Sequence, residues 1–395
     1  MTTTGNHTYG YSRIGQGRKY PLLPYSQLVW EMLQTDSEVY DYCATLKINA
    51  SDISLENIKT AFEAALRAHA VFSMNVDRAG MQYLRYSDDI MHGQYHSVDI
   101  AESEGVIVVK IRLNRILGDG ASMLLLMEDV VKALQSEPID DDGYLDYLNW
   151  YEQYKQSEKY EQCKVWLEKH FSNMDYPVLP QTDKPLMAND MGQEGVLIED
   201  YSDLYSEIQK LADDYLLTLT GFFSLCAALA IMDYNHTDSA ALTWAYEGRD
   251  REEERRVFGS LHRDIPLRIS KEEIDLTTSR GKEILFRQVR NEIRQGIAHS
   301  GYPFTLLKPQ NEVWNYAVNV LHQPSAADLM KETPFQIEIE QGTETIAYSL
   351  LDVEIYEEDG LRVLYRYSAG HYNEGSMRYF AQLVRNNAEK LLMKN

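Results

Sequence analysis

The chain of 395 residues has little cysteine: Cys43, Cys163 and Cys226 are three residues far apart in the sequence. They form no CxxC spacing and have no neighbouring histidine pair, which argues against a disulfide framework and a zinc site, so we expect no bound metal. The first residues, 1–11, also lack the basic segment and apolar run of a secretory signal peptide. A cytoplasmic location is the resulting expectation.

Positive charge is scarce as well. Thirty-eight Lys and Arg face 61 Asp and Glu, a formal net charge of −23. A surface this acidic repels phosphate backbones and anionic lipids unless it carries a concentrated basic patch, and the sequence contains no such patch. We therefore expect neither nucleic acid nor a membrane surface as a partner.

The sequence has no apolar run long enough to cross a bilayer. Its one notable charge-free stretch, Leu216–Met232, is shorter than the roughly 20 residues that a transmembrane helix needs, and it contains Thr, Ser and Gly. With 44% hydrophobic and 25% charged residues overall, the chain has the composition of a folded globular protein. The stretch is expected to be a helix buried in a core.

Helical and strand patterns alternate along the chain, which favours a mixed α/β or α+β fold. Ser54 can cap a helix running to about His69, with apolar residues at three- and four-residue spacing. The segment 109–114 then alternates apolar and polar residues, as a half-buried strand does. A turn at 118–120 and a helix over 121–134 complete a unit of strand, tight turn and helix.

A cluster of three prolines, Pro177, Pro180 and Pro185, interrupts both helix and sheet patterns. We place the boundary between two lobes there: an N-terminal extension at 1–19, an N-terminal lobe at 20–175, a linker at 176–186 and a C-terminal lobe at 187–395. In the second lobe the patterns predict helices and strands over 201–214, 216–232, 241–246, 258–269, 360–367 and 374–393.

Several short segments follow one another in a particular order: Pro24–Trp30, Arg67–Val76, Leu113–Ser122, Tyr144–Trp150, Glu247–Arg249, Gly259–Arg268 and His299–Phe304. In this order and content the chain resembles the condensation domain of nonribosomal peptide synthetases. The resemblance covers nearly all of the sequence from about Tyr20 onward.

The resemblance implies two lobes like chloramphenicol acetyltransferase, arranged as a pseudo-dimer with a channel between them. It also implies carrier proteins that deliver substrates on phosphopantetheine arms, with no permanently bound cofactor. The family's central motif is HHxxxDG, whose second histidine is read as the base or as the group that positions the attacking amine. The aspartate of the motif is structural and pairs with the arginine that closes the Gly-to-Arg strand motif.

Here the motif is degenerate, because Asn114 and Arg115 stand at the two histidine positions, whereas Asp119 and Gly120 are kept. The resemblance predicts a structural pair of Asp119 with Arg268. A guanidinium has a pKa above about 12 and no acceptor lone pair, so Arg115 cannot be a general base. If the strand continues to Arg115, that side chain faces inward and needs a partner, which is either an internal carboxylate or an anionic ligand group.

Other positions depart from the family pattern too. The RHExLRT segment survives mainly as His69, and the Asn-Thr pair that borders the channel is replaced by Arg263 and Asp264. By motif, His262 and His299 are the histidines best placed to line the channel and to replace the lost base. For each of them, a structural role is the simpler interpretation.

Three functions remain open from the sequence. The first is a non-catalytic domain, monomeric, that docks carrier proteins or tailoring enzymes, similar in kind to the family's recruitment domains, which also carry Arg at the second histidine position. The second is a transferase that forms an amide bond by positioning carrier-bound substrates without the usual histidine. The third, an acyl-CoA-dependent transferase acting on alcohols, depends even more on the missing histidine because hydroxyls are weak nucleophiles without a base.

Overall fold

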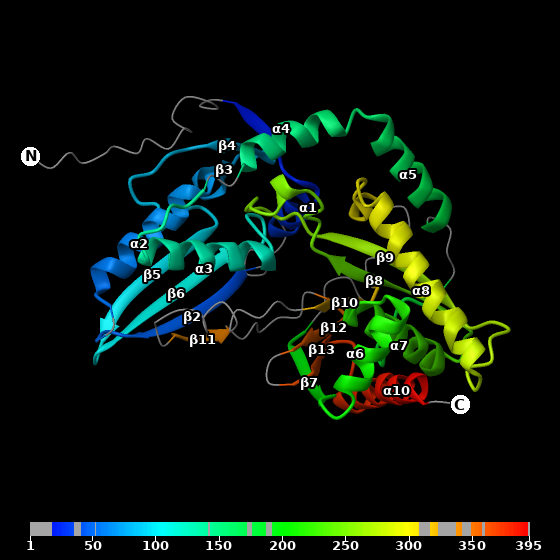
Figure 1. The fold of residues 1–395 in the computed structure, drawn as a ribbon. Coiled ribbons are helices and arrows are strands. Elements are labelled where there is room, and N and C mark those ends of the chain that lie inside the picture. The colour runs from blue at the N-terminus through cyan, green and yellow to red at the C-terminus, as the bar shows by residue number, and fades with distance from the viewer. Residues whose placement is uncertain are drawn as a thin grey trace, which may run out of the picture. The chain divides into compact units, whose positions relative to one another are not determined.

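The computed structural model describes residues 18–34, 41–51, 53–140, 143–171, 176–186, 192–307, 317–322, 337–341, 349–357 and 360–393 (Figure 1). The expected N-terminal extension lies outside these ranges apart from its last two residues. The described part is a mixture of helices and strands, as the sequence patterns predict.

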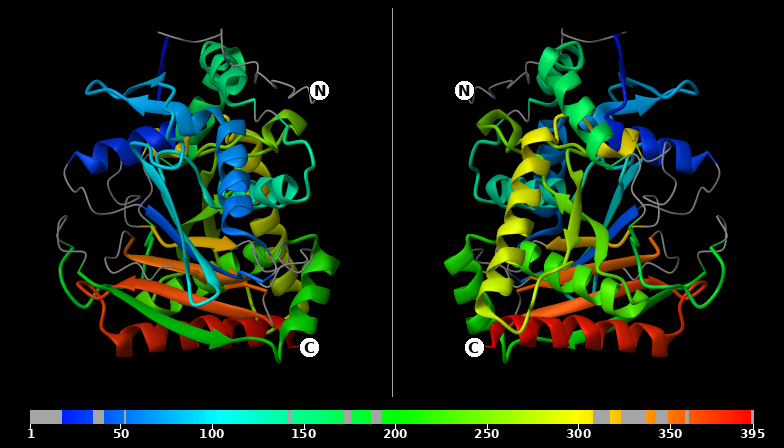
Figure 2. Two further views of the ribbon diagram at one scale, coloured as in Figure 1. Left: turned by 90° about the vertical axis from the view of Figure 1, so that its left-hand side faces the viewer. Right: turned by 90° about the vertical axis from the view of Figure 1, so that its right-hand side faces the viewer.

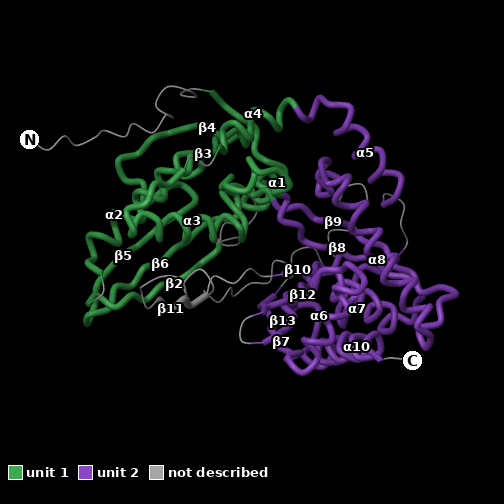
Figure 3. The backbone as a smooth tube through the Cα atoms, in the orientation of Figure 1, with its two compact units in different colours: residues 1–153, 249–261, 326–343 green, residues 154–248, 262–325, 344–395 purple. Residues whose placement is uncertain are grey.

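Contacts divide the chain into two compact units (Figure 3). Unit 1 comprises Met1–Gln153, Arg249–Leu261 and Ala326–Thr343, and unit 2 comprises Tyr154–Gly248, His262–Ser325 and Glu344–Asn395. This division differs from the expected boundary at 176–186. That proline-rich segment is irregular, but it belongs to unit 2, because its Pro177 and Val178 carbonyls accept hydrogen bonds from Ala241 and Val318.

Unit 1 contains two antiparallel sheets and their helices. Its elements are β1 (Lys19–Pro21), α1 (Pro24–Leu33), β2 (Asp41–Asn49), α2 (Leu55–Ala68), β3 (Met74–Val76), β4 (Met81–Leu84), β5 (His96–Ser103), β6 (Val106–Asn114), α3 (Gly120–Leu134), most of α4 (Tyr144–Tyr154) and β11 (Ile337–Gln341), with short 3-10 turns at Ala70–Ser73 and Glu252–Glu254. The strand orders are β1-β4-β3 and β11-β2-β6-β5.

The predicted strand and helices of unit 1 are confirmed, but the turn lies at 115–117 and not at the predicted 118–120, and Gly120 is already the first residue of α3. Alternate residues of β6 from Ile107 to Leu113 are buried, as expected for a strand with one covered face. The Ser54 hydroxyl accepts a hydrogen bond from the backbone N–H of Asn57 (3.2 Å) and so caps α2. Helix α3 begins directly after the turn and packs against α2.

Unit 2 is built on one six-stranded sheet of order β7-β13-β12-β10-β8-β9, in which β10 is parallel to both of its neighbours. Its elements are α5 (Glu158–Phe171), β7 (Glu194–Asp200), α6 (Tyr205–Tyr215), α7 (Leu219–Asn235), β8 (Ser239–Tyr246), β9 (Arg263–Ser270), α8 (Ser279–His299), a 3-10 turn at Phe304–Leu306, β10 (Asn319–His322), β12 (Leu351–Tyr356), β13 (Arg362–Ser368) and α10 (Glu374–Leu392).

The charge-free stretch forms most of α7, and every residue from Thr220 to Met232 is buried. Helices α7 and α10 pack against each other and against strands of the six-stranded sheet (Figure 2). Within the described ranges, no single helix is long and apolar enough to cross a membrane; α6 and α7 meet that criterion only as a pair bent by 101°. The expectation of a buried core helix is confirmed.

One strand prediction needs correction. The pattern over 258–269 predicts a strand that begins at Phe258, but β9 begins at Arg263. Residues 258–261 belong instead to unit 1, where Phe258 and Leu261 are buried. Phe258 and Leu261 are apolar because their side chains enter a core. Apolar residues alone do not distinguish such a loop from a buried strand.

Candidate functional site

The degenerate motif lies at the turn that follows β6. The strand ends at Asn114, whose side-chain oxygen accepts a hydrogen bond from the backbone N–H of Ile116 (3.0 Å). The Asn114 carbonyl also accepts from the N–H of Leu117 (3.0 Å). Asn114 is buried, and its side chain closes this turn in the way that asparagine often does. The residue at the first histidine position therefore has a structural task.

Arg115 is the first residue of the turn and not the last residue of the strand. The inner-face position beside Ile111 and Leu113 was expected only if the strand continued to Arg115, and β6 ends one residue earlier. The Arg115 guanidinium lies over the ring of Tyr42, 4.7 Å from its centroid, and the side chain is half-buried. Such stacking on an aromatic face is a favourable arrangement for a guanidinium.

Asp119 is the N-cap of α3. One of its carboxylate oxygens accepts a hydrogen bond from the backbone N–H of Ser122 (3.0 Å) and another from the Ser122 hydroxyl (2.9 Å). The Ser122 hydroxyl also lies 3.3 Å from the Asp119 N–H, so the two residues form a capping box. Both side chains are buried, and a carboxylate at a helix N-terminus is favoured by the helix dipole.

The cation that pairs with Asp119 is Arg249. Its two terminal nitrogens each lie 3.0 Å from a different Asp119 oxygen, a bidentate geometry, and both side chains are at most 5% exposed. The same guanidinium donates to the carbonyls of Val257 (3.1 Å) and Gly259 (3.2 Å). A buried carboxylate thus receives the partner that it needs.

The predicted pairing of Asp119 with Arg268 is wrong. Arg268 lies on β9 in unit 2, where its guanidinium donates to the carbonyl of His170 (3.2 Å), lies 3.8 Å from the Glu292 carboxylate and stacks near Phe171. The arginine of the Glu247–Arg249 segment takes the role instead. Glu247–Arg249 is one of the segments on which the family resemblance rests, so the sequence marked it as notable. The resemblance did not, however, assign a role to its arginine.

Arg249 begins a segment that we call the strap, Arg249–Leu261, which belongs to unit 1 although the chain on both sides of it belongs to unit 2. The Leu261 N–H donates to Asp119 (2.9 Å), and the Gly259 N–H donates to the Ser122 hydroxyl (3.1 Å). The Ser260 hydroxyl donates to the carbonyl of Arg115 (2.5 Å). The strap therefore holds the backbone of the motif from one side.

His69 is fully buried and takes part in an ion cluster on α3. Its Nε2 lies 2.9 Å from Oδ2 of Asp129, and Arg256 of the strap donates to both Asp129 oxygens (2.7 and 2.8 Å). Burial on its own would raise the pKa of the Asp129 carboxyl, but the hydrogen bonds from His69 and Arg256 bring it below its usual value. The sequence pattern assigned no role to Asp129. It favoured a solvated loop or helix face for the charged run 249–256, and this prediction is wrong for Arg249 and Arg256, which pair with buried carboxylates.

The other candidate residues, His262, Arg263, Asp264 and His299, all lie in unit 2. His299 stacks on Trp166 with ring centroids 4.2 Å apart, and its Nδ1 lies 2.8 Å from the carbonyl of Gln295. These contacts support a structural role for His299. Arg263 donates to the Ser300 hydroxyl (3.0 Å). The predicted roles of these four residues in lining a channel, and the channel itself, stay predictions.

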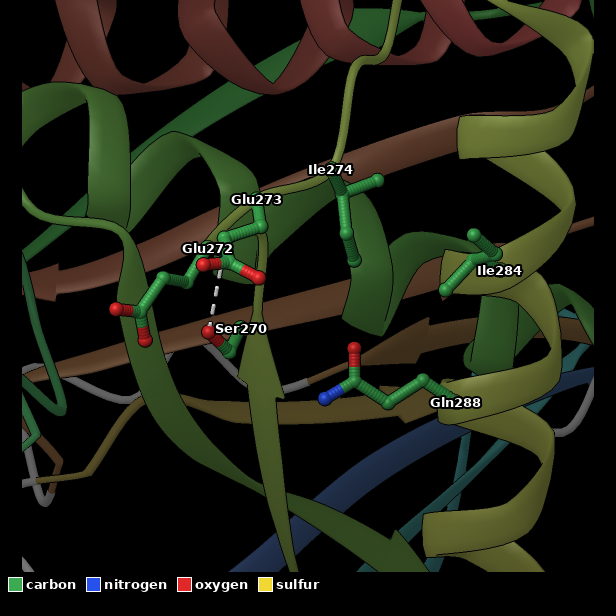
Figure 4. A pocket seen from close by; sticks show the side chains of 6 residues that line it. All are labelled: Ser270, Glu272, Glu273, Ile274, Ile284 and Gln288. Atoms are coloured by element: carbon green, nitrogen blue, oxygen red, sulfur yellow. Dashed lines mark hydrogen bonds between the residues drawn. The ribbon is translucent and has the colours of Figure 1, made fainter.

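A surface hollow in unit 2 lies between the end of β9 and α8 (Figure 4). Its lining is Ser270, Glu272, Glu273, Ile274, Ile284 and Gln288, so it includes none of the motif residues. In the part of the chain that the structure describes, no group of three His, Cys, Asp or Glu side chains is placed to hold a metal ion. The motif turn therefore remains the candidate site.

Comparison with solved structures finds similar folds over nearly the whole chain. The condensation domain from the monacolin K polyketide synthase MokA is 13% identical, with a TM-score of 0.76 and coverage of 95% of this chain and 97% of that one. The starter condensation domain of the rhizomide synthetase RzmA, solved as a mutant with C8-CoA, is 15% identical, with a TM-score of 0.75 and coverage of 95% and 96%.

A third similar structure is the X-domain from teicoplanin biosynthesis, which is 14% identical, with a TM-score of 0.73 and coverage of 95% of this chain and 94% of that one. These likenesses confirm the fold that the resemblance implies, with two lobes like chloramphenicol acetyltransferase. A comparison with curated protein sequences finds no match.

A model of one protein family matches residues 115–394, well over half of the chain, and its description is "Condensation domain". The match begins at the motif turn and includes Asp119 and the whole strap, Arg249–Leu261. Sequence family and fold agree: this chain belongs to the condensation-domain family.

Proposed function

We propose that this protein is a non-catalytic condensation domain, which docks carrier proteins or tailoring enzymes of nonribosomal peptide biosynthesis. The observation that carries the proposal is the motif turn. Asn114 uses its side chain to close the turn, and Arg115, at the position of the second histidine, offers a permanently charged donor.

The chemical argument concerns proton transfer. Attack of an amine on a thioester requires a proton to leave the nitrogen, and a positioned general base accelerates such a step by about 10² to 10⁴-fold. A guanidinium has no lone pair that could accept this proton. Arg115 can bind an anion or stabilise developing negative charge. It cannot take up the proton of the amine, and this missing step is why we favour docking over amide formation.

The contacts that hold the motif turn in place are all present, so the two missing histidines have not disrupted the local fold. Asp119 still caps α3 and still has a bidentate arginine partner, and the strap still binds the turn. The buried pair of Asp119 and Arg249 stabilises this scaffold, because removing either partner would leave an uncompensated buried charge. We therefore expect a partner to meet a folded scaffold that lacks the catalytic base.

The kind of partner is suggested by the similar structures. The X-domain from teicoplanin biosynthesis is also solved as a complex with OxyB, and a condensation domain of the calcium-dependent antibiotic synthetase is solved with a substrate analogue. By analogy with these complexes, we propose a tailoring enzyme or a carrier protein with its phosphopantetheine arm as the partner here. A monomeric state and a cytoplasmic location complete the proposal.

Restoring the histidines tests the proposal. Arg115→His, alone and combined with Asn114→His, is mixed with loaded donor and acceptor carrier proteins, and amide product is measured by mass spectrometry. We expect no product from the unaltered protein and measurable product from the double variant. Product from the unaltered protein that disappears in Arg115→Ala would instead establish the transferase that works by positioning.

A further inference from the structure

The strap is held at the start of α3 and again further along that helix by two ion pairs; at the start, Ser122 and Asp119 also accept from the Gly259 and Leu261 N–H groups. The first ion pair is that of Asp119, at the N-cap, with Arg249. The second is that of Asp129, about 15 Å further along the helix at a rise of 1.5 Å per residue, with Arg256. Arg251, between the two anchors, stacks on Trp150 with its guanidinium carbon 3.7 Å from the ring centroid.

The second anchor is a buried ion cluster. The Asp129 carboxylate is fully buried; Arg256 contacts both of its oxygens, and His69 contacts one of them. Lys132 approaches the other oxygen at 3.6 Å, and Glu128 lies 3.5 Å from Arg256. Among the residues described, Arg256 is the strap's ionic contact with this cluster, and Phe258 of the strap adds an aromatic contact with His69.

Only a short length of strap separates this anchor from the motif turn. Phe258 is buried with its ring 4.9 Å from that of His69 and 4.8 Å from that of Phe72. Two residues later, the Ser260 hydroxyl donates to the carbonyl of Arg115. Phe258 and Ser260 therefore lie on the short path of contacts that joins Arg256 to Arg115.

We propose that Arg256, held by Asp129 and His69, is a positioning residue for the Arg115 turn, and that Ser260 transmits its effect. The strap in its anchored position fixes the Arg115 backbone and with it the direction in which the guanidinium leaves the turn. The proposal rests on the proposed function only in treating that turn as the site that meets a partner. The coupling itself is measured without any partner.

Hydrogen exchange on the full chain tests the coupling. Arg256→Gln removes the ion pair with Asp129, and Ser260→Ala removes only the hydrogen bond to Arg115. Arg255→Gln is the matched control, because the Arg255 side chain is 67% exposed and, in the described part, its ion pair is with Glu252. We expect Arg256→Gln to speed exchange at 114–118 and 256–261 by about tenfold or more, since the open population rises. Ser260→Ala should affect 114–118 alone, and Arg255→Gln neither.

A second readout reports on the side chain. In an Arg115→His background, the introduced imidazole is followed by NMR, and its chemical shift and titration midpoint are expected to change with Arg256→Gln and Ser260→Ala but not with Arg255→Gln. If Arg256→Gln fails to fold, Arg256→Lys keeps the charge and loses the bidentate contact. Unchanged exchange at 114–118 and an unchanged imidazole signal in the Arg256 and Ser260 variants would overturn the proposal, whatever partner the protein binds.

Discussion

At the scale of single residues, the site is defined by what replaces an imidazole. Histidine titrates near neutral pH, so it can accept a proton and later donate it. Neither asparagine nor arginine can accept a proton near neutral pH, so neither can replace histidine as a general base. Asn114 instead satisfies a backbone N–H, and Arg115 stacks on Tyr42. At the two histidine positions of the family motif, this chain thus has a residue that closes the turn and an arginine stacked on an aromatic ring.

The pairing of Arg249 with Asp119 gives a direct stability prediction. Arg249→Ala leaves a buried carboxylate without its main partner, and we expect the free energy of unfolding to fall by about 3–5 kcal/mol. Arg255→Ala, at an exposed pair, should change it by about 1 kcal/mol or less. Urea unfolding of both variants measures the difference. Equal effects of the two substitutions would refute the assignment of Arg249 as the partner.

His92 gives a prediction for pH. Hydrogen bonds with Asp99 and Asp89 raise the pKa of its imidazole above the ordinary value of 6.5. The charged form is therefore favoured in the folded state, so its stabilising effect is complete below pH 6.5 and disappears as the pH rises through the raised pKa.

We expect His92→Gln to lower the free energy of unfolding at pH 5.5 and to have a smaller effect at pH 8.5, measured by urea unfolding at several pH values. Asp238→Asn, at an exposed carboxylate elsewhere on the chain, serves as a control for the general effect of removing one surface charge. A constant difference between unaltered protein and His92→Gln across this range would contradict the prediction.

At the scale of elements, the local sequence pattern predicts several helices and strands correctly. The alternation in β6, the cap of α2, the start of α3 and the buried α7 all follow from residue spacing and from caps, which act within one or two turns. The strap could not be predicted in this way. Its residues leave unit 2 after β8, bind unit 1 and return to start β9, and no local period encodes such a path.

Helix α8 shows a packing requirement that the sequence pattern does not reveal. It covers the edge strand β9, and the Glu292 side chain accepts from the backbone N–H of Arg268 (3.2 Å). Gly296 allows this close approach, since a Cβ there would lie 2.2 Å from a methyl carbon of Ile265.

Gly296→Ala is accordingly expected to lower the free energy of unfolding by about 1–3 kcal/mol through overpacking. The matched control is Gly120→Ala at the start of α3, where an added Cβ would have nothing within 4 Å. That variant should be neutral or slightly stabilising, because alanine is the better helix former. Thermal or urea unfolding of the two variants provides the comparison, and a neutral Gly296→Ala would contradict the close packing of α8 on β9.

At the scale of the whole molecule, the ordered motifs were enough to predict the family and the fold, and both are confirmed. They were not enough to predict the site. Asp119 was expected to pair with Arg268 on the basis of the family pattern alone. The sequence contains several arginines, and only the path of the chain in three dimensions decides which of them lies beside Asp119. Arg249 arrives there because it begins the strap.

The central claim is that this condensation domain has kept its scaffold and lost amide formation. A single-turnover reaction with excess unaltered protein, a loaded donor carrier and a loaded acceptor carrier tests it most directly, with Arg115→Ala run beside it. We predict that amide forms no faster than in the mixture of carriers alone, with either protein. Rapid product formation by the unaltered protein that is lost in Arg115→Ala would contradict the account.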